Sequence, residues 1–152
     1  MANSKRTTMA SGLAYKDPRA ALTWLEAAFG FETTMVVENS DGTIGHSEMR
    51  LGEGTIYVGR EWDEKHCSPA SISGLNTQSL HIHLAEGLDM HCERARKAGA
   101  TILREPADQF YGDRNYVAMD PEGHVWSFSQ TLRSMTLEEM SKAGGVSVRE
   151  RL

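Results

Sequence analysis

The stretch YKDPRAALTWLEAAFGFE (residues 15–32) decides the fold, because its pattern returns later in the chain. Its apolar residues recur at helical spacing. Pro18 suits a first helical turn, and Gly30 suits the position just past a helix end. The stretch therefore predicts a helix over residues 18–29, preceded by a short strand over residues 13–16.

The second half of the chain restarts the same pattern. Apolar residues alternate over residues 80–84, which predicts a strand, and a helical pattern follows over residues 89–98. The interval 17–30 has the same length as the interval 86–99. We interpret this agreement as an internal repeat.

Three strand-like runs follow each predicted helix. The hairpins LGEGTIYVG (51–59) and DPEGHVWSF (120–128) match when their Glu-Gly pairs are superimposed. The sequence thus predicts an α+β fold of two βαβββ modules. The predicted runs are 32–37, 44–51, 55–60, 101–104, 115–119 and 124–131.

The repeat also predicts how the chain is divided. Residues 61–77 contain serine, proline and glycine and are typical of a linker. After the second module, Thr136 and Glu139 form a plausible capping box for one short helix. The expected segments are a flexible N-terminus (1–8), a first module (9–60), a linker (61–77), a second module (78–133) and a C-terminal tail (134–152).

Composition excludes several classes of protein. The net charge of −5 gives no reason to expect a nucleic-acid partner. No segment approaches the roughly 20 apolar residues that span a bilayer, so we expect no membrane partner and a cytoplasmic location. The two cysteines, Cys67 and Cys92, indicate free thiols rather than a disulfide framework.

The runs YKDPRAALTWLEAAFGFE (15–32), GHSEMRLG (45–52) and EPADQFYGDRNYVAMDPEGHVWSF (105–128) carry a family resemblance. The chain resembles the vicinal oxygen chelate superfamily of glyoxalases, bleomycin resistance proteins and dioxygenases, most closely its glyoxalase-like, PhnB-like branch. The resemblance implies a curved mixed sheet around a small-molecule cavity, and a homodimer. It does not choose an activity, because this fold serves lyases, isomerases, dioxygenases and drug-sequestering proteins.

Metal enzymes of this superfamily hold a divalent ion with one residue from the first and one from the last strand of each module. Carrying that pattern over gives Ala10, Val58, Ser79 and Ser127. Alanine and valine have no donor atom, and a neutral serine hydroxyl is a weak ligand. We therefore expect neither a metal nor another cofactor, with a relocated divalent-metal site built from Glu48 and the histidines as the alternative.

Strand alternation predicts which side chains face the cavity. Tyr57, Trp126 and Phe128 are expected to face the helices, and His124 is expected at the surface. Tyr111 and Arg114 lie in a loop that either closes over a ligand or braces the hairpin. The predicted cavity residues are His46, Glu48, Arg60, Ser79, His81, His83, Asn115 and Ser127.

Three functions remain open at this point. The first is a metal-independent protein that binds a small molecule. The second is a glyoxalase-like lyase or isomerase, or a dioxygenase, that uses a relocated metal or the acid–base chemistry of His81, His83 and Glu48. The third is a partner-binding module that uses the tail as an arm. Whether the chain is an enzyme is left open.

Overall fold

A computed structural model describes residues 6–151. The expected flexible segment 1–8 therefore lies mostly outside the described residues. Each module contributes one helix and four strands. The first contains β1 (Ala10–Tyr15), α1 (Pro18–Phe29), β2 (Glu32–Glu38), β3 (Ile44–Leu51) and β4 (Gly54–Arg60). The second contains β5 (Ser79–His83), α2 (Leu88–Lys97), β6 (Thr101–Asp108), β7 (Asp113–Met119) and β8 (Val125–Thr131).

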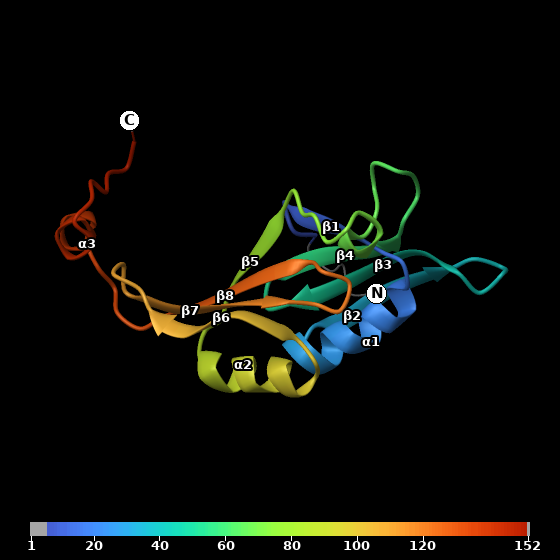
Figure 1. The fold of residues 1–152 in the computed structure, drawn as a ribbon, viewed down its shortest axis with the longest axis horizontal. Coiled ribbons are helices and arrows are strands. Elements are labelled where there is room, and N and C mark those ends of the chain that lie inside the picture. Colours follow the sequence, from blue (N-terminus) through green and yellow to red (C-terminus); the bar gives the residue numbers. More distant parts are fainter. Residues whose placement is uncertain (1–5, 152) are drawn as a thin grey trace.

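The two modules have the same topology. The sheets have the orders β1-β4-β3-β2 and β5-β8-β7-β6. The first and last strands of each module pair in parallel, and the other neighbours are antiparallel. Figure 1 shows α1 and α2 on one side of the two sheets. The predicted α+β fold of two βαβββ modules is confirmed.

The two helices begin and end differently. Asp17 caps α1 by accepting from the backbone N–H of Ala20 at 3.0 Å, and Gly30 ends it in the left-handed conformation at φ 78°. Helix α2 begins after Gly87 and has no side-chain cap at its N-terminus. The first helix is therefore the better defined by its own sequence.

One core joins the modules. The ring of Phe29, at the end of α1, lies 4.8 Å from Phe128 and 5.2 Å from Trp126 between centroids. Trp126 and Phe128 are fully buried, as predicted. Aromatic packing of this kind ties the first helix to the second sheet.

A buried carboxylate also links the modules. Asp120 follows β7 and accepts hydrogen bonds from the Tyr15 hydroxyl at 2.7 Å and from the Trp126 indole at 3.1 Å. Burial and the neighbouring Asp120 carboxylate raise the pKa of Tyr15, so its hydroxyl stays a donor. The expected surface position of His124 is wrong. Its imidazole is buried and bonds the carbonyl of Ala14 at 2.8 Å, because the end of β1 covers it.

The predicted orientation of β4 is also wrong. Val58 is fully buried in the core, whereas Tyr57 is 37% exposed on the opposite face. Matching the hairpin glycines shifted the repeat by one residue: Tyr57 pairs with Gly12 of β1 as Ser127 pairs with His81 of β5, so Tyr57 and not Val58 corresponds to Ser127. Such a slip turns every side chain of a strand to the other face.

Two further segments complete the structure. A single 3-10 turn, Pro69–Ser71, lies in the segment between the modules. The tail forms helix α3 (Leu137–Gly144), and the predicted capping box of Thr136 and Glu139 is confirmed. None of the helices formed by residues 6–151 has both the length and the apolarity needed to cross a lipid bilayer.

Candidate functional site

The face of the second sheet that points away from the helices carries a cluster of polar side chains. Along β5, Ser79, His81 and His83 alternate onto this face. Strand pairing places His81 opposite Ser127 of β8. We call this surface the second open face.

Hydrogen bonds fix several of these groups. The Ser79 hydroxyl lies 3.2 Å from Nε2 of His81. Nε2 of His83 lies 3.0 Å from the Thr131 hydroxyl, which itself donates to Asp113 at 2.8 Å. Because the Thr131 proton is committed to Asp113, Nε2 of His83 carries the proton of the first bond. Nδ1 of the neutral ring is then an acceptor.

The loop before β7 extends this network. The Asn115 side chain donates to the Tyr111 hydroxyl at 2.9 Å and accepts from Gln109 at 3.0 Å. Arg114 differs, because it pairs with Asp89 of α2 at 2.8 Å and with Asp108 at 2.7 Å. The expected loop position of Arg114 is wrong, because β7 already begins at Asp113. Arg114 braces the hairpin against the helix, and Tyr111, in the turn before β7, stays beside the second open face.

The first sheet presents a different surface, which we call the first open face. Nε2 of His46 lies 3.3 Å from the Glu48 carboxylate, and the His46 ring packs edge-on against Tyr57 with centroids 5.1 Å apart. Met35 and Val37 of β2 pair with Glu48 and His46 and share this face. Arg60 lies three residues after Tyr57 in β4, so its side chain points to the opposite face of the sheet. The structure therefore does not bring it to His46 and Glu48.

A cavity of about 670 Å³ lies between the modules. Strand β5 forms one wall, and the β3–β4 turn around Gly52 and Gly54 forms the other. Phe31 and Ile56 supply apolar surface, whereas His81 and His83 bring polar groups from β5. Cavities of this size, with apolar walls and a few polar groups, are typical of sites for drug-sized molecules.

The proposed metal ligands do not converge. Glu48 lies in the first sheet, and His81 and His83 lie in the second. Within residues 6–151, no three His, Cys, Asp or Glu side chains are grouped closely enough to hold a metal ion. A relocated site made of these three residues is therefore not formed within the described part of a single chain.

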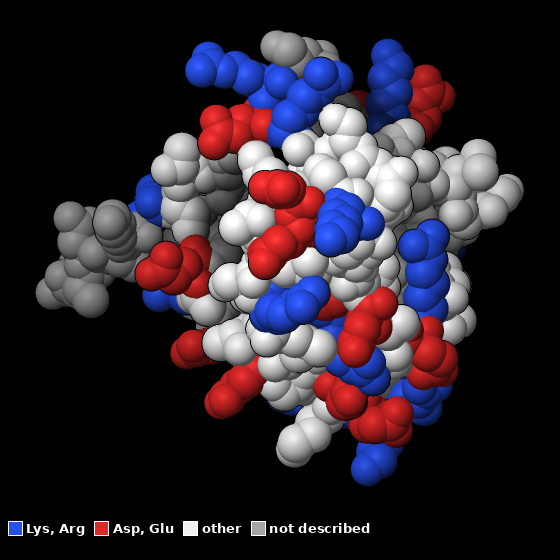
Figure 2. All heavy atoms as spheres, turned by 90° about the vertical axis from the view of Figure 1, so that its left-hand side faces the viewer, with Lys and Arg blue, Asp and Glu red and all other residues white. Residues whose placement is uncertain are grey.

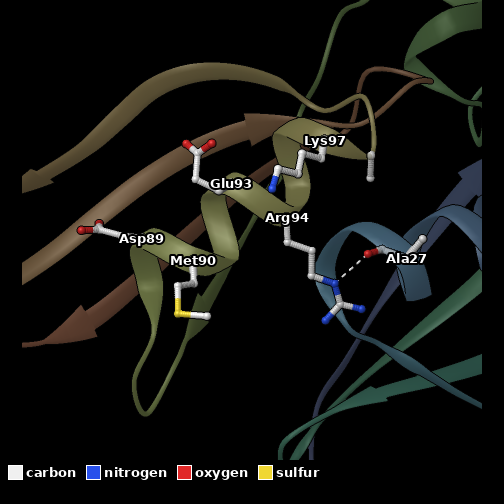
Figure 3. Close-up of a pocket in the computed structure, with 7 residues that line it drawn as sticks. Ala27, Asp89, Met90, Glu93, Arg94 and Lys97 are labelled. Atoms are coloured by element: carbon white, nitrogen blue, oxygen red, sulfur yellow. Dashed lines mark hydrogen bonds between the residues drawn. The ribbon is translucent and has the colours of Figure 1, made fainter.

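A second hollow, of about 640 Å³, lies on the outside between the two helices. Figure 3 shows Arg94 reaching from α2 to the carbonyl of Ala27, while Asp89 and Glu93 point elsewhere. Arg94 donates at 2.7 Å to the carbonyls of both Ala27 and Glu26, the last turn of α1. The Arg94 guanidinium therefore caps the end of α1, and it braces the two helices against each other across this hollow.

Sequence reasoning missed several polar groups. Ser129 lies two residues after Ser127 on the same face of β8, and the alternation of strand side chains could have predicted it. Tyr57 was missed because of the one-residue shift. His91 of α2 is half-buried and bonds the Phe29 carbonyl and the Tyr116 hydroxyl, and no sequence signal distinguished it from a surface histidine. Burial lowers the pKa of His91, so its ring is neutral when folded at neutral pH.

Charged groups do not gather by sign on the end of the molecule that carries α3. Figure 2 shows acidic and basic side chains mixed on this face, with uncharged surface between them. A nucleic-acid surface would need clustered cations. This face therefore offers no electrostatic footprint for a phosphate backbone.

A family model described as the glyoxalase/bleomycin resistance protein/dioxygenase superfamily matches residues 7–128. An uncharacterized protein of Mycobacterium bovis is 28% identical over 147 residues, which are 94% of this chain and 95% of that protein. The crystal structure of TioX from Micromonospora sp. ML1 is 32% identical, with a TM-score of 0.68, and the match covers 84% of this chain and all of that one.

A further solved structure is more distant in sequence. TnmS3 from Streptomyces sp. CB03234, described as an antibiotic binding protein, is 16% identical with a TM-score of 0.64. The match covers 84% of this chain and 98% of TnmS3. At that identity the likeness concerns the fold.

Proposed function

The chain belongs to the glyoxalase/bleomycin resistance protein/dioxygenase superfamily, and on that premise we propose that it binds a small molecule between its two modules without a divalent metal. The observation that carries the proposal is the cavity between β5 and the β3–β4 turn. It combines the apolar surface of Phe31 with the polar groups of His81 and His83. Such a combination positions a ligand while apolar burial supplies affinity.

The expected ligand is an aromatic or planar compound, and we expect a positively charged one to bind best. The net charge of −5 favours the approach of a cation. TnmS3, a protein with the same fold, is described as an antibiotic binding protein. That description supports binding of an antibiotic-like molecule here.

The donor set supports metal independence. With the strand register corrected, the four positions of the superfamily pattern become Ala10, Tyr57, Ser79 and Ser127, because Gly12 pairs with Tyr57 as His81 pairs with Ser127. A methyl group, a neutral phenol and two hydroxyls do not fit a divalent ion that prefers imidazole, thiolate or carboxylate. Elemental analysis of untagged protein tests this, and one divalent ion per subunit would contradict it.

A second candidate function is metal-free acid–base catalysis. The chain His83–Thr131–Asp113 supports it, because it holds the proton on Nε2 and leaves Nδ1 as an acceptor on the second open face. Glu48 pairs with His46 on the other sheet and takes no part in the hydrogen bonds that join His83, Thr131 and Asp113. In this second reading, His83 acts as the base.

One experiment separates binding from turnover. Titration calorimetry with a panel of aromatic antibiotics should detect binding, and mass spectrometry of the recovered ligand should find it unchanged. His81→Ala with His83→Ala should weaken binding about tenfold, the loss of one charged or well-placed polar contact. His66→Ala, in the exposed segment between the modules, is the matched control and should bind like the wild type.

Each result points one way. Binding without chemical change supports the sequestering role. A changed ligand whose formation is lost in His83→Ala supports the catalytic reading. If no compound of a broad antibiotic and metabolite panel binds, the proposed function is wrong.

We further propose that two copies of the chain associate. Proteins of this superfamily commonly form homodimers, and the family match supports the same association here. Sedimentation equilibrium tests the association, and a monomer at micromolar concentration would contradict it.

A further inference from the structure

The two modules hold each other through reciprocal hydrogen bonds. Phe29 and Ala98 occupy equivalent positions, because each lies one residue before the glycine that follows its helix. The Phe29 carbonyl accepts from the ring of His91, and the Ala98 carbonyl accepts from the indole of Trp24, both at 2.8 Å. The modules are thus related by an approximate two-fold axis, and a contact made in one direction can be compared with its equivalent in the other.

The outer edge of β1 receives further donors from the second module. In a parallel pair of strands, alternate residues direct their N–H and C=O groups to the neighbouring strand. The Tyr15 carbonyl accepts from the residue that follows β4 at 3.2 Å, so the carbonyls of Gly12 and Ala14 point away from β4. The side-chain amide of Gln78 donates to Gly12 at 3.1 Å, and Nε2 of His124 donates to Ala14 at 2.8 Å. Two N–H groups therefore close this edge.

The outer edge of β5 has no such donors. The Leu84 N–H donates to the Ser129 carbonyl of β8 at 2.7 Å, so the carbonyls of His81 and His83 point away from β8. The strand register makes them the equivalents of the two closed carbonyls of β1. Within residues 6–151, no hydrogen bond reaches either of them. We call these groups the two open carbonyls.

Two differences in residue type explain why they are open. Gln78 lies immediately before β5, and Met9 lies immediately before β1. A thioether has no hydrogen to donate, so Met9 cannot do for β5 what Gln78 does for β1. His124 and Gly54 are equivalent in the strand register, and glycine has no side chain. The repeat has therefore lost both donors in one of its two halves.

The two open carbonyls border the cavity between the modules. All seven residues from 79 to 85 line it. Successive side chains of a strand point to opposite faces, so an unbroken run shows that the edge of β5 meets the cavity. Gly54 lines the opposite wall, where its equivalent His124 has a ring. A ligand in the cavity therefore meets two acceptors that the chain leaves without a donor.

We propose that the ligand of this cavity donates N–H groups to the backbone carbonyls of His81 and His83. It would take the places that the amide of Gln78 and the imidazole of His124 take on β1. The two carbonyls lie two residues apart, which is about 6.6 Å along an extended strand. An aromatic compound with an N–H donor at each end fits this spacing. The proposal rests on the proposed function and adds to it the chemical class of the ligand.

The donor can be a neutral amide or a protonated amine or amidine. Hydrogen bonds from a charged donor are the stronger ones, so the cation should bind better than the amide. The net charge of −5 acts in the same direction. A compound that offers only acceptors, such as a carboxylate, has nothing to donate to the two open carbonyls.

An NMR titration tests the contact with para-aminobenzamidine, a planar cation with N–H donors at both ends of one ring. The backbone carbonyl carbons of His81 and His83 should shift on binding, whereas that of Ile82, which points to β8, should not. The fully N-methylated analogue keeps the ring and the charge but has no N–H. It should bind at least tenfold more weakly, and the uncharged para-aminobenzamide should bind between the two.

Variants that restore the lost donors give a second readout. Gly54→His should weaken binding of para-aminobenzamidine at least tenfold, because its ring can bond the His83 carbonyl. Gly54→Ala is the matched control and should bind like the wild type, since a Cβ there meets only the Leu51 carbonyl, at 3.4 Å. Met9→Gln should also weaken binding about tenfold, and it does so from outside the cavity lining. Its control is Met9→Leu, at a side chain that is 84% exposed.

The results separate this proposal from the proposed function. Equal binding of the N–H compounds and the methylated cation overturns the donor contact, and so does wild-type binding by both Gly54→His and Met9→Gln. If antibiotics of the panel bind but para-aminobenzamidine shifts neither carbonyl, the cavity binds small molecules and only the donor contact is wrong. If no compound of either set binds, both proposals are wrong.

Discussion

The two modules share a topology but stabilise it with different chemistry. The first packs mostly apolar side chains behind its sheet; of its buried polar groups, Ser47 bonds the Val58 carbonyl and the Tyr15 hydroxyl donates to Asp120 of the second module. The second buries Asp120 and His124, and it bonds the half-buried His91 to the buried Tyr116. No buried side-chain polar atom among the described residues lacks a hydrogen-bond partner.

This difference indicates how each module fails. An apolar core loses stability gradually as side chains are truncated. A bonded polar group is costly when one partner is removed, because the other is left buried and unsatisfied. The second module should therefore be sensitive at a few positions, and the predictions below test this from the largest effect to the smallest.

Asp120→Ala should have the largest effect. It removes the acceptor of Tyr15 and Trp126 and of two backbone N–H groups in the turn before β8. The loss of stability should be about 3 kcal/mol or more, since each orphaned donor costs about 1–3 kcal/mol. Urea unfolding followed by tryptophan fluorescence measures it.

Asp41→Ala is the matched control in the first module. Asp41 lies in the exposed β2–β3 turn and accepts only from Thr43. Its removal should change stability by less than about 0.5 kcal/mol. If the two substitutions cost the same, the second module does not depend on its polar network.

The next prediction concerns the link between the helices. Arg94 donates to two carbonyls at the end of α1, so Arg94→Ala should destabilise the protein by about 1–2 kcal/mol. Arg96, two residues further along α2, pairs with Glu93 and Glu105 on the surface, and Arg96→Ala should cost at most about 1 kcal/mol. Thermal unfolding of the two variants side by side measures the contrast, which disappears if Arg94 is only a surface charge.

Much of this architecture could be predicted from the sequence. Pro18 and Gly30 mark the start and the end of the first helix, and the repeat has the same spacing in both halves. Together they predicted both modules in the right order. The one-residue error in β4 arose because turn glycines were matched, although Gly54 lies inside a strand and Gly123 does not. Turn lengths vary between repeats, whereas the alternation of buried residues does not.

The candidate site was harder to predict for a physical reason. The alternation of side chains along a strand predicts which face of the sheet a side chain occupies, but it does not predict the distance of that side chain from a residue on another sheet. His81 and His83 were placed correctly along β5, yet Glu48 was grouped with them although it lies in the other sheet. Burial of His124 and His91 depends on contacts with the first module, which local pattern does not encode.

A smaller effect is expected at the helix starts. Asp17 accepts from the Ala20 N–H in the first turn of α1, so Asp17→Ala should cost about 1 kcal/mol. Asp89 is the first-turn acid of α2 and only pairs with Arg114 at the surface, so Asp89→Ala should cost less than about 0.5 kcal/mol. Chemical unfolding of both measures it. A larger cost at Asp89 would mean that α2 depends on this acid as a cap.

The smallest effect is a pH dependence that belongs to the second module alone. Nε2 of His91 lies 2.8 Å from the Phe29 carbonyl and must donate to it, so Nδ1 accepts from the Tyr116 hydroxyl at 2.6 Å. Leu22 occupies the matching position in α1, since it lies five residues after Asp17 as His91 lies five after Glu86. The variant His91→Leu with Tyr116→Phe therefore gives the second module the chemistry of the first, but it leaves the Phe29 carbonyl without its donor.

The sign of the pH effect follows from the pKa of His91, which burial lowers in the folded protein. Below about pH 6.5 the unfolded chain binds a proton at His91, whereas the folded protein leaves this ring unprotonated until a lower pH. The stability it provides is therefore full above about pH 6.5 and is lost as the pH falls toward the folded pKa. Urea unfolding at pH 7.5 should show the double variant to be less stable than the wild type by about 1–3 kcal/mol, because the Phe29 carbonyl loses its donor. At pH 5.5 this difference should be smaller, because the wild type loses stability there and the variant does not; parallel curves would show that His91 accepts its proton in the folded state and that the bonded pair is not what distinguishes the modules.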